Sequence, residues 1–111
     1  MQVVRKPWGK ECILINTDLY CAKIITCKDN LWSSGGKFHY HKKKDETFRV
    51  LQGRLELAVV NGENVKTKFM TVNDEMRIRP GTPHRFRSDN CKFLEVSTHD
   101  DWEDSYRVEL G

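Results

Sequence analysis

The chain has 111 residues, of which 38% are hydrophobic, 32% charged and 10% aromatic. This composition is typical of a folded globular protein and excludes wholesale disorder. The net charge of +3 is compatible with anionic small ligands, but it is too small and too scattered to indicate a nucleic-acid partner. The length predicts one domain over residues 1–111.

The first eleven residues lack the apolar core of a signal peptide, and no apolar run is long enough to cross a bilayer. We therefore expect a cytoplasmic location and no membrane partner. The four cysteines form no CxxC pair, and without a secretion signal they are expected to be reduced and mostly buried.

Short segments with period-two patterning, separated by turn residues, dominate the sequence. In chain order they are Glu11–Asn16, Tyr20–Thr26, Lys37–His41, Glu46–Leu51, Arg54–Val60, Val65–Met70, Glu75–Arg79, His84–Arg87 and Lys92–Thr98. The stretch Trp102–Leu110 is ambiguous between a final helical turn and an extended tail. Many short strands at regular spacing predict an all-β sandwich or barrel.

Three histidines and one glutamate carry the chemistry. His39 and His41 are two residues apart, so a strand directs both side chains to one face. Glu46 opens the next predicted strand after a short loop, and His84 follows a rigid turn that contains two prolines and a glycine. Three imidazoles and a carboxylate suit one divalent transition metal, and Mn, Fe, Co, Ni, Cu and Zn all accept such ligands. We expect His39, His41, Glu46 and His84 to be the metal ligands.

These residues resemble the two sequence signatures of the cupin family. The first signature is matched by the HxH pair, four intervening residues, Glu46, six further residues and Gly53. The second is matched at Gly81 and His84. The resemblance implies a single-domain cupin, an all-β double-stranded β-helix or jelly-roll barrel that binds a metal. It also implies a homodimer, with Val3 and Val4 on an edge that two copies can share.

Four further segments resemble the C-terminal domain of type II mannose-6-phosphate isomerases. They are Lys6–Gly9, Arg79–Phe86, Glu95–Ser97 and Asp100–Arg107, in the same order as in that family. The resemblance implies a sugar or sugar-phosphate substrate and an isomerase-like function.

The first functional hypothesis is therefore aldose–ketose isomerisation through a metal-stabilised enediolate. Such a reaction needs a base that moves a proton between two carbons, and the sequence leaves its identity open. The candidates are Glu56 and Tyr40, with His99 and Glu46 as further possibilities. Basic residues that can meet a phosphate are Lys37, Arg49 and Arg85, with Lys43 as a fourth.

Two alternatives come from other functional classes. The same ligands around Fe(II) would suit a dioxygenase of a small molecule. The small size of the chain also suits a non-enzymatic sugar-binding module. The three consecutive lysines at 42–44 are expected to form an exposed, solvated loop rather than a binding element.

Overall fold

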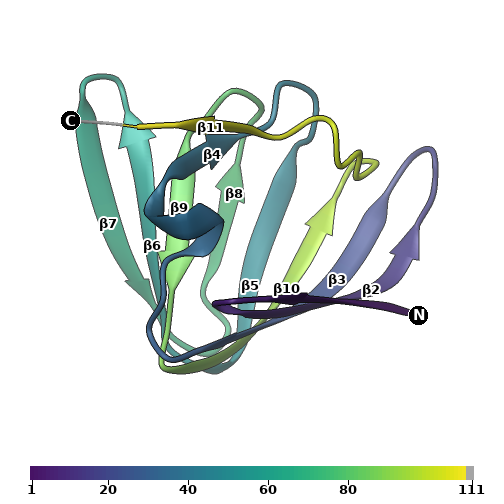
Figure 1. Ribbon diagram of the computed structural model, residues 1–111, viewed down its shortest axis with the longest axis horizontal. Helices are drawn as coiled ribbons and strands as arrows, with labels where there is room; N and C mark the ends of the chain where they lie inside the picture. The colour runs from purple at the N-terminus through teal and green to yellow at the C-terminus, as the bar shows by residue number, and fades with distance from the viewer. Residues whose placement is uncertain (110–111) are drawn as a thin grey trace.

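The computed structural model describes residues 1–109, and within them the chain is all-β (Figure 1). Two antiparallel sheets face each other. Sheet A has the order β1-β2-β3-β10-β5-β8, and sheet B has the order β11-β4-β9-β6-β7. This arrangement confirms the jelly-roll barrel of the predicted fold class.

The strands of sheet A are β1 (Gln2–Lys6), β2 (Gly9–Asn16), β3 (Cys21–Lys28), β10 (Asn90–Ser97), β5 (Glu46–Gly53) and β8 (Glu75–Ile78). Those of sheet B are β11 (Tyr106–Val108), β4 (Phe38–Tyr40), β9 (His84–Arg87), β6 (Leu55–Asn61) and β7 (Asn64–Met70). A short 3-10 turn, η1 (Ser33–Gly36), precedes β4. Across residues 1–109, no helix has the length and apolar character needed to span a membrane.

The hydrophobic core lies between the sheets, where each strand presents alternate residues inward. Trp8 meets Phe86 edge-to-face with ring centroids 5.0 Å apart, and Phe48 and Phe93 lie 4.6 Å apart. Aromatic pairs of this kind contribute about 0.5–1.5 kcal/mol beyond the area they bury. Aliphatic side chains and thiols fill the remaining space, namely Ile25, Cys27, Val50, Leu55, Leu57, Val59, Met70, Ile78 and Cys91.

The predicted strands are found with small shifts at their ends, and two elements go beyond the prediction. β1 was not predicted, and it pairs with β2 from Gln2 to Lys6. The ambiguous stretch Trp102–Leu110 contains an extended segment, because Tyr106–Val108 pairs with β4; Leu110 lies outside the described residues. All four thiols are free, three buried and Cys12 partly exposed.

The turn glycine Gly53 is required by close packing as well as by conformation. Its φ is +80°, and a Cβ built there would lie 2.0 Å from the carbonyl oxygen of Asn90. Gly62 has a similar φ of +66°, but a Cβ there meets nothing within 4 Å.

We expect Gly53→Ala to lower the free energy of unfolding by about 3 kcal/mol, because it adds a backbone clash to the strain of a positive φ. The control Gly62→Ala carries only the conformational strain and should cost about 1 kcal/mol. Urea titration of the two variants measures the difference. Equal losses would contradict the packing argument.

Candidate metal centre

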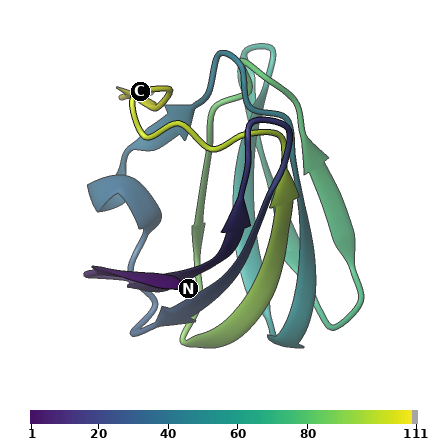
Figure 2. The ribbon, with the colours of Figure 1, turned by 90° about the vertical axis from the view of Figure 1, so that its right-hand side faces the viewer.

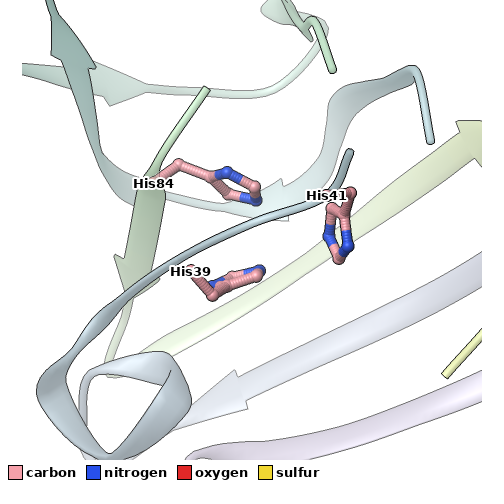
Figure 3. Close-up of side chains that lie close together, drawn as sticks. All are labelled: His39, His41 and His84. Carbon is pink, nitrogen blue, oxygen red and sulfur yellow. The ribbon is translucent and has the colours of Figure 1, made fainter. Parts of the chain in front are cut away.

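Two paired strands of sheet B and one strand of the facing sheet A bring the predicted ligands together between the sheets. His39 and His84 are register partners across β4 and β9 in sheet B. His41 directly follows β4, and Glu46 opens β5 on the facing sheet A. Figure 3 shows the three imidazoles turned toward one another from β4 and β9. The convergence follows from alternation, which sends residues 39, 41 and 84 to the inner face.

The spacing of the ligand atoms fits one cation. One ligand nitrogen from each of His39, His41 and His84 lies within 4.8 Å of the other two. An Oε2 atom of Glu46 lies 3.3 Å from Nε2 of His41 and 3.6 Å from Nε2 of His84. The three imidazole nitrogens, with the Glu46 oxygen beside two of them, match the mixed donor set that first-row divalent metals accept.

Each imidazole is held through its outer nitrogen by an oxygen atom. Nδ1 of His41 donates to the carbonyl oxygen of Asp104 at 2.6 Å, and Nδ1 of His84 donates to that of Thr82 at 2.9 Å. Nδ1 of His39 lies 3.0 Å from the hydroxyl oxygen of Ser34. A carbonyl can only accept, so Nδ1 carries a proton in both His41 and His84. In His84, whose pKa is lowered by burial so that the ring is neutral, the lone pair therefore sits on Nε2. Oxygen partners that fix the ring and its tautomer are typical of metal-ligating histidines.

Two buried polar atoms at this point have no hydrogen-bond partner, Oε2 of Glu46 and Nε2 of His84. The side chains of Glu46 and His84 are 2% and 1% exposed, so bulk water does not reach them. An unpaired buried polar atom costs about 1–3 kcal/mol, and more when it is charged. Oε2 of Glu46 and Nε2 of His84 are both acceptors, so they repel each other, and a cation bound between them would stabilise both. The residues therefore fit a divalent metal.

The protonation states also suit a metal. Burial lowers the pKa of His39 well below its ordinary value, and the neighbouring His84 and His41 lower it further. Burial likewise lowers the pKa of His84, so both rings are neutral. Burial alone would raise the pKa of Glu46, but contact with His41 and the ammonium of Lys44 hold it below the usual range. The result is two neutral imidazoles and one carboxylate, the forms that bind metals.

A buried ionic network adjoins the ligands. Nζ of Lys44 lies 3.2 Å from Glu95, 2.9 Å from Asp100 and 3.9 Å from Oε1 of Glu46. Lys23 continues the network, 2.9 Å from the other oxygen of Asp100 and 2.8 Å from Glu11. The expectation that residues 42–44 form an exposed loop is therefore wrong for Lys44, which is buried because it neutralises these carboxylates.

The two candidate bases face away from the histidines. Glu56 lies on the outer face of β6 and pairs with Nε of Arg87 at 3.0 Å. Tyr40 lies on the opposite face of β4 from His39, and its ring stacks on that of Tyr106. The expectation that these side chains face the cavity is corrected by the same alternation that turns their neighbours inward. His99 is exposed and contacts the carbonyl oxygen of Thr17.

Of the basic residues expected to meet a phosphate, two lie on the surface and the third is partly buried. Lys37 is exposed, 3.4 Å from Glu109, and Arg49 pairs with Glu75 at 2.9 Å. Arg85 donates to the carbonyl oxygen of Gly36 at 2.7 Å and stacks over two aromatic rings, Trp32 and Phe38. The structure therefore does not bring these three side chains to the histidines. The exposed Lys43 contacts Asp104 through its backbone.

Sequence reasoning missed the residues that support the ligands. Alternation carried a signal for two of them, because Lys23 shares the inward face of β3 with Cys21 and Ile25. Glu95 lies likewise between inward residues of β10. Asp104 carried no local signal, since the loop residues that it binds are 60 to 63 positions away in sequence.

Comparison with known proteins supports the same family. The family model described as "Cupin domain" matches residues 33–97, more than half of the chain. That match shows that the chain belongs to the cupin family. No curated protein sequence matches the chain.

Solved structures share the fold at low sequence identity. KdgF from Halomonas sp. aligns with a TM-score of 0.75 and 14% identity, over 93% of this chain and 90% of that one. Oxalate decarboxylase from Bacillus subtilis aligns with a TM-score of 0.81 and 13% identity, over 96% of this chain but only 30% of its own. The capsular polysaccharide assembling protein CapF from Staphylococcus aureus aligns with a TM-score of 0.77 and 16% identity, over 98% of this chain and 32% of that one. Identities this low establish the fold alone.

We expect His41→Ala to lower metal content and thermal stability together, because a bound metal stabilises the folded state by mass action. His99→Ala is the matched control, since His99 lies outside the cluster and is exposed. Metal analysis by plasma mass spectrometry and thermal denaturation, with and without a chelator, measure both effects. Unchanged metal content in the first variant would count against the site.

Proposed function

We propose that this chain is a metal-binding cupin, with residues 1–111 acting as one domain, in which His39, His41, Glu46 and His84 hold one divalent transition metal. The observation that carries the proposal is the pair of buried, unpartnered atoms, Oε2 of Glu46 and Nε2 of His84, 3.6 Å apart. The shared orientation of the three imidazoles supports it, because each has an oxygen atom at Nδ1.

We further propose a sugar or sugar phosphate as the substrate and aldose–ketose isomerisation as the reaction. The support is the sequence resemblance to type II mannose-6-phosphate isomerases, together with a similar fold in a protein described as assembling capsular polysaccharide. A bound divalent metal would supply Lewis-acid polarisation of a carbonyl oxygen.

The chain's own residues set the conditions around that metal. Histidines held at Nδ1 fix the ligand geometry without reorganisation. The hydrophobic core excludes water from one side of the ligands. The ion pair of Lys44 and Glu95 places two ionisable groups beside them. Because Glu56 and Tyr40 face outward, inward-facing carboxylates such as Glu95 take their place as candidates for proton transfer.

A screen with the metal-loaded protein tests the proposed reaction. The resident metal is first identified in protein purified without added metal, and the protein is then fully loaded with that metal. Phosphorylated and free aldoses are added in deuterated water, and their conversion is followed by NMR. We expect aldose–ketose conversion with deuterium entering at the carbon next to the carbonyl, and no consumption of oxygen. Oxygen uptake would favour the dioxygenase alternative, and tight sugar binding without turnover would favour a binding module.

We also propose a homodimer that covers the outer face of sheet A. Register places Val3, Cys12, Ile24 and Leu94 in one row across four strands of this face. Val96, which is 51% exposed, lies beside that row. Contiguous apolar residues on an exposed sheet face are typical of protein interfaces.

A cytoplasmic location, expected from the sequence, stays a prediction.

Sedimentation of two lysine variants tests this surface. Val96→Lys places a charge within the apolar face and should shift the protein from dimer to monomer. Val65→Lys is the matched control, because Val65 is also 51% exposed but lies on β7 of sheet B. Wild-type protein that sediments only as a monomer at high concentration would reject the dimer.

A further inference from the structure

The segment between β10 and β11 crosses from one sheet to the other beside the metal centre. Figure 2 shows the chain leaving the end of β10 and running toward β4. Within this segment, Trp102 is 83% exposed, whereas the polar residue Asp104, two positions later, is 6% exposed. A buried carboxylate in a connecting segment needs partners that justify its burial.

The carboxylate of Asp104 accepts three consecutive backbone hydrogen bonds. Oδ1 accepts from the amide of Lys42 at 2.9 Å, and Oδ2 accepts from those of Lys43 and Lys44 at 3.1 Å each. These amides belong to the loop that joins two ligands, His41 and Glu46. The carboxylate therefore fixes the stretch of chain that sets the distance between them.

The backbone of the same residue holds one of the ligands. Its carbonyl oxygen accepts from Nδ1 of His41 at 2.6 Å. The other two imidazoles use partners close in sequence, Ser34 for His39 and Thr82 for His84. His41 alone depends on a residue 63 positions away.

We infer that Asp104 is a positioning residue of the metal centre, which anchors the C-terminal segment so that its carbonyl aims Nε2 of His41 at the metal. This inference rests on the proposed metal-binding function. Loss of the carboxylate frees three amides in a loop where Lys42 and Lys43 are exposed. Water can reach the amides of Lys42 and Lys43, and only the buried amide of Lys44 loses its acceptor, so the fold should survive while the carbonyl loses its fixed place.

The test compares Asp104→Ala and Asp104→Asn with Glu103→Ala. Glu103 is adjacent and exposed, so its removal subtracts the same charge without touching the loop. Affinity for Co²⁺ and Zn²⁺ is measured by competition with a chromophoric chelator. We expect Asp104→Ala to bind about 10–100-fold more weakly, as for other partners of metal-bound histidines. Asp104→Asn keeps one acceptor oxygen, so its metal affinity should lie between those of the wild type and Asp104→Ala. The affinity of Glu103→Ala should stay within about twofold of the wild type, as expected for an exposed charge.

Proton NMR of the Co²⁺ protein, with ring-labelled histidine for assignment, separates positioning from general loosening. In Asp104→Ala we expect faster exchange of the imidazole N–H of His41, with those of His39 and His84 unchanged. Equal affinities of Asp104→Ala and Glu103→Ala, or equal changes at all three histidines, would overturn the inference. Wild-type protein that binds neither metal would instead refute the proposed function itself.

Discussion

Two unpartnered acceptor atoms that face each other in the buried interior are the constraint on which the proposed metal centre depends. Oε2 of Glu46 lies 3.6 Å from Nε2 of His84, and neither atom has a hydrogen-bond partner. Nδ1 of His84 donates to Thr82, so the lone pair of this neutral ring is on the nitrogen that faces the carboxylate. Without a cation, this arrangement carries the cost of unsatisfied buried acceptors. A divalent metal converts the same arrangement into a source of folding free energy.

The barrel can hold this arrangement because the polar and apolar parts of its interior are separated. Aromatic rings and aliphatic side chains fill one part, including Phe48, Phe86 and Phe93. Ion pairs fill the other part, beside the ligands. Lys44 pairs with Glu95 and Asp100, and Asp100 also pairs with Lys23. Packing supplies the rigidity, and the ion pairs allow charged side chains to lie next to the candidate ligands without exposure to bulk water.

The sequence was sufficient for the parts of the structure that follow from local rules. Period-two patterning predicts most of the strands, and the spacing of His41 and Glu46 predicts that these two side chains, which lie 3.3 Å apart, approach each other. Alternation also explains the errors. Glu56 and Tyr40 are neighbours of inward residues, so they face outward. Applying the same rule to β4 and β6 would have excluded both as groups in the cavity.

The residues that support the ligands could not be predicted in this way, because they depend on long-range contacts. Lys44 belongs to a run of three lysines that looks solvated, and only its pairing with Glu95 and Asp100 explains its burial. Asp104 reaches the loop after β4 only because the C-terminal segment returns across the barrel to form β11. Such contacts are fixed by the three-dimensional path of the chain, not by spacing along it.

X-ray absorption at the edge of the resident metal, on protein purified without added metal, tests the central claim most directly. The account predicts a first shell of nitrogen and oxygen at about 2.0–2.2 Å with the multiple scattering of imidazoles. The four free thiols lie outside this shell. Sulfur scattering at about 2.3 Å, or protein that holds no metal and takes none up, would contradict it.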